Sequence, residues 1–233
     1  MREDAGSARA TALRPDGLHD LRGRPVPAAL RYGPTDLVVV SGLPGAGKST
    51  LMARCAQAPL IDSQHVRESY QDRLPPWLPY AAFRPLVRST HYLRLLAELR
   101  ASGPLVIHDC GTVPLVRSWV RRTARRQGRH VHLLFLDADA QAARGGQHAR
   151  GRSLSAREFA RHCTVAQRSL DLLLAASAPP PGWASAVLLD RAGARNLREI
   201  GFRPPPGRAA ALPVSREPRG SQDTGRARLV RGG

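Results

Sequence analysis

Residues 42–50 combine residue types and spacing that suit phosphate binding. The stretch follows an apolar run at 37–40 and fits the pattern G-x-x-x-x-G-K-[ST], known as the P-loop. In order, it contains Gly42, Leu43, Pro44, Gly45, Ala46, Gly47, Lys48, Ser49 and Thr50. Its glycines let backbone N–H groups curl around a phosphate, and the amino end of the following helix adds positive partial charge. The pattern predicts a binding site for a nucleoside triphosphate.

Lys48 is the one lysine of the chain, beside 35 arginines. A compact ammonium fits the phosphate cradle, whereas the wider, forked guanidinium does not. The motif therefore predicts that Lys48 reaches the β- and γ-phosphates and that the Ser49 hydroxyl binds Mg²⁺. The expected cofactors are ATP and Mg²⁺.

Asp109 directly follows a second apolar run, at 105–108. A carboxylate at such a strand end can hold Mg²⁺ or orient the group that receives a phosphate. The alternative is that it caps the next turn. Motor ATPases place a Glu after this Asp to polarise water, whereas Cys110 stands here. This difference favours phosphoryl transfer over hydrolysis.

Asp62 and Arg67 follow a short apolar segment at 59–61. The carboxyl ends of parallel strands face one crevice, so we expect Asp62 near the γ-phosphate. There it can accept the proton of an attacking hydroxyl, while Arg67 holds an anionic acceptor. The alternative is that Asp62 only caps a helix and that Arg67 is a solvated surface charge.

Arginines also gather after the fourth apolar run, on a segment that contains glycines. They are Arg144, Arg150 and Arg152. Such a cluster suits a lid that closes over the triphosphate and neutralises the charge that develops during transfer. Arg150 is the strongest candidate for a catalytic lid residue, although an ordinary basic surface helix shows the same pattern.

Short apolar runs alternate with helical patterns between residues 35 and 202, which indicates an α/β domain. We predict a P-loop NTPase three-layer sandwich with a mostly parallel five-stranded sheet. The expected strands are 36–41, 59–62, 105–108, 131–136 and 186–189. The expected helices are 48–57, 64–73, 82–101, 113–127, 140–149 and 156–176. Residues 1–34 are expected to be a disordered or loosely packed arm, and 203–233 a disordered tail.

The net charge of +18 is spread along the chain, with +2 in residues 1–34, +11 in 35–202 and +5 in 203–233. A general arginine bias explains this spread as well as a nucleic-acid surface does, so nucleic acid stays open as a partner. Three widely spaced cysteines without a C-x-x-C pair indicate reduced thiols. Because no leader or apolar run of about 20 residues is present, we expect a cytoplasmic protein that does not cross a membrane.

Together these segments resemble the P-loop kinases of the polynucleotide kinase and zeta-toxin type, often described as AAA-type ATP-binding proteins. The resemblance covers about residues 36–175 and implies transfer of the γ-phosphate of ATP to a hydroxyl acceptor. It implies that phosphates and metal are held by Lys48, Ser49 and Thr50. It also implies that Asp62 is the base, that Arg67 and Asp109 hold the acceptor, and that Arg150 belongs to the lid.

Two departures from this family motivate an alternative. Gln64 stands where the family has an acid three residues before the arginine, and Arg144 and Arg150 are six residues apart instead of four. The alternative is a module that uses ATP as a switch with little turnover and associates with nucleic acid. The identity of the acceptor cannot be read from these residues.

Overall fold

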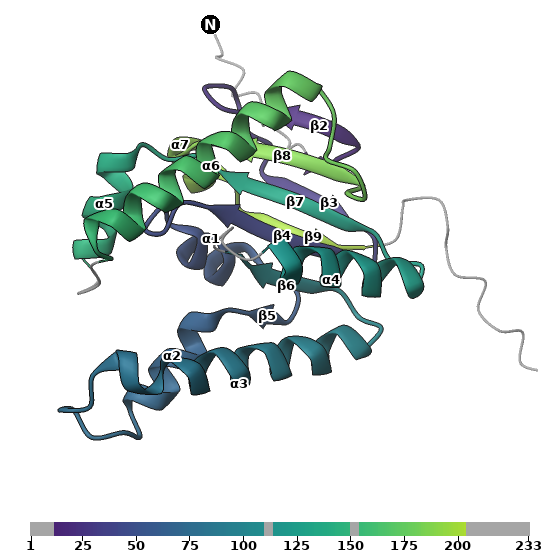
Figure 1. Cartoon of the computed structure of the whole chain (residues 1–233). Coiled ribbons are helices and arrows are strands. Elements are labelled where there is room, and N and C mark those ends of the chain that lie inside the picture. Colours follow the sequence, from purple (N-terminus) through teal and green to yellow (C-terminus); the bar gives the residue numbers. More distant parts are fainter. Residues whose placement is uncertain (1–11, 110–113, 150–153, 204–233) are drawn as a thin grey trace, which may run out of the picture.

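The computed structural model describes residues 12–109, 114–149 and 154–203. Strands in these ranges are β1 (Ala12–Leu13), β2 (Gly17–Asp20), β3 (Ala29–Tyr32), β4 (Leu37–Gly42), β5 (Leu60–Ile61), β6 (Leu105–His108), β7 (Val131–Leu136), β8 (Ser185–Leu189) and β9 (Glu199–Phe202). Their pairing is parallel throughout, in a six-stranded sheet of order β2-β8-β7-β4-β6-β5 and a three-stranded sheet of order β1-β3-β9 (Figure 1). The predicted α/β class is confirmed.

Helices cover the six-stranded sheet on both faces. They are α1 (Lys48–Cys55), α2 (Ser63–Gln71), α3 (Tyr80–Arg100), α4 (Pro114–Arg126), α5 (Ala140–His148), α6 (Ala156–Ala176) and α7 (Arg191–Asn196). Every residue of β4, β7 and β8 is buried, as expected for parallel strands that are packed on both faces. This burial explains why these strands read as continuous apolar runs in the sequence.

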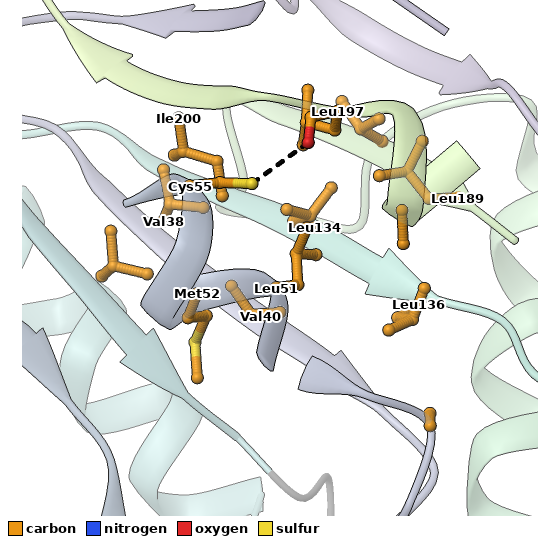
Figure 2. Packing of buried hydrophobic residues seen from close by; sticks show 14 of the residues in the cluster. Val38, Val40, Leu51, Met52, Cys55, Leu134, Leu136, Leu189, Leu197 and Ile200 are labelled. Atoms are coloured by element: carbon orange, nitrogen blue, oxygen red, sulfur yellow. Dashed lines mark hydrogen bonds between the residues drawn. The ribbon is translucent and has the colours of Figure 1, made fainter. Parts of the chain in front are cut away.

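One face of the sheet packs against α1 and the small sheet. Figure 2 shows Met52 of α1 near Val40 and Cys55 of α1 beside Val38, with Leu197 and Ile200 next to Cys55. The Cys55 thiol donates a hydrogen bond to the backbone oxygen of Leu197 at 3.1 Å. The opposite face packs against α3, α4 and α6, so the main sheet is the middle of three layers.

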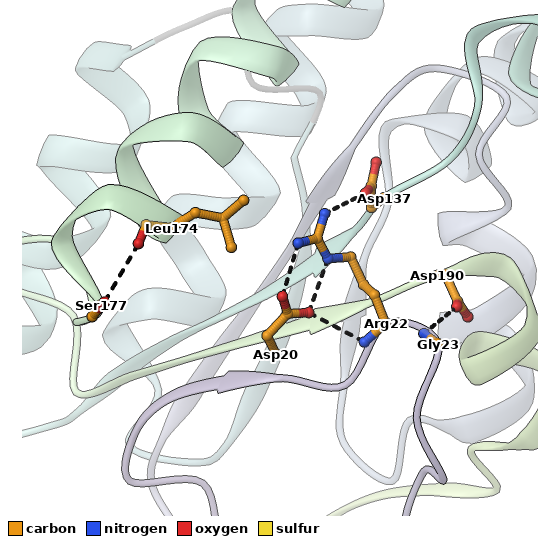
Figure 3. Close-up of polar contacts among 7 residues, drawn as sticks. All are labelled: Asp20, Arg22, Gly23, Asp137, Leu174, Ser177 and Asp190. Atoms are coloured by element: carbon orange, nitrogen blue, oxygen red, sulfur yellow. Dashed lines mark hydrogen bonds and ion pairs between the residues drawn. The ribbon is translucent and has the colours of Figure 1, made fainter.

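Residues 12–32 differ from the expected loosely packed arm, because they form β1, β2 and β3. β2 pairs with β8 and makes the main sheet six strands wide instead of five. Arg22 fixes this edge through ion pairs of 2.8 Å with Asp20 and with Asp137, which follows β7 (Figure 3). Most of the predicted tail lies outside the described residues.

The amino ends of the central strands share a chain of buried polar side chains. His132 Nε2 lies 3.1 Å from an Asp36 oxygen, and His132 Nδ1 lies 2.8 Å from the Ser185 hydroxyl. Ser185 is fully buried, so this serine, histidine and aspartate have no access to a substrate. Their role is to satisfy one another inside the sheet.

None of the helices that the structure describes is long and apolar enough to cross a membrane.

Candidate active site

The loop between β4 and α1 forms the predicted phosphate cradle. Gly42 and Gly45 have φ angles of 137° and 86°, which side chains rarely tolerate. A Cβ atom at Gly42 would meet the backbone oxygen of Leu136, and one at Gly45 would meet that of Ala143. The cradle is therefore held closely between β7 and α5, which leaves no room for side chains at these two positions.

The Lys48 side chain lies inside this cradle. It is 3% exposed, and its ammonium donates hydrogen bonds of 2.8 Å to the backbone oxygens of Gly42 and Leu43. A bound phosphate can replace these carbonyls as the partner of the ammonium. The buried position also strengthens attraction to a phosphate, because few water molecules screen the charge.

The cradle opens into a cleft of about 680 Å³. Of the predicted loop residues, those that line the cleft are Pro44, Gly45, Gly47, Lys48 and Ser49. Leu43 and Ala46 instead belong to the buried core, and Thr50 is exposed and lies outside the cleft lining. The cleft continues past Asp62, His108 and Asp109 towards one face of α3.

Asp62 lies in this cleft directly after β5. Its Oδ1 accepts a hydrogen bond of 2.9 Å from the backbone N–H of Gln64 and so caps α2. Its Oδ2 is buried and has no hydrogen-bond partner among the described residues. The cap that we weighed as an alternative is thus present, and the second oxygen remains available for another partner.

The Asp62 carboxyl is ionised at neutral pH. Burial raises its pKa, but nearby His108, the Gln64 N–H and the Ser49 hydroxyl together hold the pKa below its usual value. Burial and the neighbouring Lys48 lower the pKa of His108 to about 4, so this imidazole is neutral at pH 7. The ionised carboxylate therefore lies beside the neutral His108 imidazole, in a form suited to accept a proton.

Asp109 also faces the cleft, and it contacts a residue that the sequence did not single out. Arg117 of α4 donates hydrogen bonds to Asp109 Oδ2 at 2.5 Å and to the Ser41 hydroxyl at 2.7 Å. Arg117 therefore points into the sheet edge and does not lie on a solvated face. Its partners come from two neighbouring strand ends, which only the folded sheet brings together.

Hard oxygen donors that suit Mg²⁺ lie beside the cradle. The Ser49 hydroxyl and the Asp109 carboxylate both line the cleft. The part of the chain that the structure describes has no group of three His, Cys, Asp or Glu that could hold a metal by itself. This set fits a magnesium ion that takes its remaining ligands from phosphates and water.

Arg67 of α2 lines the same cleft as Asp62. Its guanidinium lies over the Tyr80 ring, 4.0 Å from the centroid, and its buried Nε has no hydrogen-bond partner among the described residues. Arg84 and Arg88 of α3 line the cleft beside it.

Of the three predicted lid arginines, only Arg144 lies within the described residues. α5 packs on the cradle, where the Gln147 amide donates a 3.0 Å hydrogen bond to the backbone oxygen of Pro44. Arg144 is not among the residues that line the cleft, and its guanidinium lies over the Phe159 ring instead. Arg150 and Arg152 lie outside the described residues.

Comparison with known families agrees with this geometry. The model of the AAA domain family matches residues 37–173, which is more than half of the chain. The chain belongs to the AAA domain family. This AAA domain has the P-loop NTPase fold, and its motif identifies a nucleotide-binding cleft. No curated protein matches the chain.

Several solved structures are similar to this AAA domain. One is a putative kinase from Chloroflexus aurantiacus, with 17% identity, a TM-score of 0.47, and coverage of 66% of this chain and 87% of that one. Another belongs to the PezAT toxin–antitoxin system of Streptococcus pneumoniae, with 16% identity, a TM-score of 0.48 and coverage of 70% of both chains. A gluconokinase from Sinorhizobium meliloti has 18% identity, a TM-score of 0.38, and coverage of 69% of this chain and 85% of that one. These similarities do not identify the molecule that accepts a phosphate.

Proposed function

We propose that this protein is an ATP- and Mg²⁺-dependent kinase of the polynucleotide kinase and zeta-toxin type. It transfers the γ-phosphate to a hydroxyl of a nucleotide, a nucleic-acid end or a small molecule. The main support is that an ionised, buried Asp62 lines the same cleft as Lys48 and Ser49. A base beside a phosphate cradle suits transfer to a hydroxyl.

The proposed reaction uses residues of this cleft. The acceptor oxygen attacks the γ-phosphorus, its proton passes to Asp62, and the bond to the β-phosphate oxygen breaks to leave ADP. Lys48 neutralises charge that grows on the bridging and γ-phosphate oxygens. Ser49 and Asp109 would hold Mg²⁺, which would supply further charge neutralisation. Arg67 orients the acceptor, and a lid role for Arg150 and Arg152 stays a prediction from the sequence.

Replacement of Asp62 by Asn tests the proposal. Asn can still cap α2, so Asp62→Asn is expected to lower phosphoryl transfer about 10²-fold or more while ATP affinity stays within about twofold. Asp72→Asn, at the exposed end of the same helix, is the matched control. Transfer of label from γ-labelled ATP to nucleosides, sugars and 5′-hydroxyl oligonucleotides is the measurement. Unchanged turnover in Asp62→Asn would remove this residue from the mechanism.

A second candidate is a nucleotide-dependent switch with little turnover. Its support is Gln64, which stands at the position where the resembled kinases have an acid. The Gln64 amide donates a 2.6 Å hydrogen bond to Glu68. This candidate predicts ATP binding without label on any acceptor, together with salt-sensitive association with nucleic acid. Label on any acceptor in the same assay would favour the kinase.

A further inference from the structure

One part of the cleft has an apolar wall. Its members come from two strands and two helices, and they are Val39 of β4, Ile107 of β6, Val87, Tyr92 and Leu95 of α3, and Val116 and Val120 of α4. Tyr92 and Val116 are half-buried, and the others are buried. Most of them belong to the hydrophobic cluster between the sheet and these helices, or pack against it. This part of the cleft therefore borders the hydrophobic core.

Two buried polar atoms of the same cleft lack a partner. They are Asp62 Oδ2 and His91 Nδ1, and neither has a hydrogen-bond partner among the described residues. His91 stands four residues from both Val87 and Leu95, so it shares the face of α3 that forms the wall. Buried polar atoms without a partner are costly, so a ligand that pairs with both is favoured here.

A hydroxyl group suits these two atoms. Burial lowers the pKa of His91, and the charge of Asp62 offsets this effect only in part, so the imidazole is neutral at pH 7. A neutral imidazole with its proton on Nδ1 donates a hydrogen bond there, whereas an ionised carboxylate only accepts. A hydroxyl can accept from His91 and donate to Asp62 at the same time. This orientation directs its proton towards the proposed base.

We infer that the acceptor is an alcohol with an apolar ring, whose hydroxyl lies between Asp62 and His91 while the ring packs on the apolar wall. This inference rests on the proposed kinase function and names its acceptor class. The acceptor oxygen bonds to the γ-phosphorus, its proton passes to Asp62, and the bond to the β-phosphate oxygen breaks. The products are a phosphate monoester and ADP. A sugar fits poorly, because its further hydroxyls would lose water against the wall without gaining new partners.

A matched pair of alcohols tests the inference through turnover. Cyclohexylmethanol and glucose both carry a hydroxymethyl group on a six-membered ring, but glucose adds polar ring groups. With γ-labelled ATP, kcat/KM for cyclohexylmethanol is expected to exceed that for glucose about 10-fold or more. Benzyl alcohol and adenosine extend the comparison to a flat apolar ring and to a nucleoside.

Variants of His91 test the polar end of this site. His91→Phe keeps an apolar ring on the wall but removes the donor, so kcat/KM for cyclohexylmethanol should fall about 10-fold while KM for ATP stays unchanged. His91→Asn can place an amide N–H close to the position of Nδ1 and should recover part of this loss. Equal loss in both variants would argue against the hydrogen bond from His91.

Binding measurements separate this inference from the kinase proposal. With the P-loop saturated by Mg²⁺ and a non-hydrolysable ATP analogue, saturation-transfer NMR measures the affinity for cyclohexylmethanol and for glucose. Val116→Phe would fill the space beside the wall and should weaken binding of cyclohexylmethanol about 10-fold or more. Leu115→Phe is the matched control, because Leu115 is 80% exposed and lies outside the cleft lining.

Binding of cyclohexylmethanol that Val116→Phe weakens supports the inference even if no label is ever transferred, and in that case the kinase proposal alone fails. Equal affinity for glucose, no binding of cyclohexylmethanol, or equal effects of Val116→Phe and Leu115→Phe would overturn the inference. Displacement of cyclohexylmethanol by the ATP analogue would also overturn it, because the wall would then belong to the base of ATP. The comparison of the two alcohols uses the parent protein, so it decides the matter even if Val116→Phe fails to fold.

Discussion

At the scale of single residues, the chemistry of the cleft depends on two charged side chains, Lys48 and Asp62, that are almost fully buried from water. Lys48 is buried with its ammonium on two carbonyl oxygens, and Asp62 is buried with one oxygen unpartnered. An isolated buried charge is unfavourable, so both groups favour a ligand of opposite charge or a proton donor. The same two residues were predicted from sequence, because their roles follow from residue type and position after a strand.

Lys48→Arg tests whether the shape of this cation matters. The substitution keeps the charge, but the forked guanidinium is too wide for a cradle that packs closely against Leu136 and Ala143. We expect ATP affinity in the presence of Mg²⁺ to fall about 10²-fold, measured by calorimetry. An affinity within about threefold of the parent protein would contradict the proposed role of the loop.

At the scale of elements, the two ends of the central strands have different roles. The cleft lies at the carboxyl ends of β4, β5 and β6. The buried polar contacts among Asp36, His132 and Ser185 lie at the amino ends of β4, β7 and β8. The Gly33 N–H donates a further 2.6 Å hydrogen bond to Asp36. These contacts satisfy polar groups that the core would otherwise leave unpaired.

His132→Ala is therefore expected to lower stability without changing the site. It removes one partner of Asp36 and leaves the buried Ser185 hydroxyl without its His132 contact, at a cost of about 2–4 kcal/mol in the free energy of unfolding. Urea denaturation measures this loss, and kcat for the surviving folded protein should stay within about twofold. His148→Ala is the control, because His148 is exposed and is not among the ion-pair partners of Asp36. Equal stability of the two variants would argue against a structural role for the buried contacts among Asp36, His132 and Ser185.

At the scale of the whole molecule, the described N-terminal segment is part of the sheet and does not form an arm. β2 has no continuous apolar run, and its residues are only partly buried. Its place at the sheet edge depends on β8 and on Arg22, which contacts residues distant in the sequence. The Gly23 backbone N–H donates a 2.8 Å hydrogen bond to the Asp190 carboxylate (Figure 3).

Arg22→Gln tests this attachment. Loss of ion pairs to Asp20 and Asp137 is expected to lower the free energy of unfolding by about 1–2 kcal/mol, since both pairs are partly buried. Thermal denaturation and protease cleavage near residues 17–24 are the measurements, with exposed Arg24→Gln as the control. If Arg22→Gln were as stable and as protease-resistant as Arg24→Gln, the ion pairs would not hold the edge.

Local sequence patterns were enough to predict the α/β class, the five strands 36–41, 59–62, 105–108, 131–136 and 186–189, and the placement of Lys48, Asp62, Arg67 and Asp109 around one crevice. These features follow from local patterns, because an apolar run marks a buried parallel strand and its end marks the site. Which of the other arginines face that crevice depends on the folded arrangement. Arg88 and Arg117 line it and Arg144 does not, because the direction of a long charged side chain depends on partners distant in sequence. The same reason applies to β2, whose pairing depends on long-range contacts and has no periodic signal of its own.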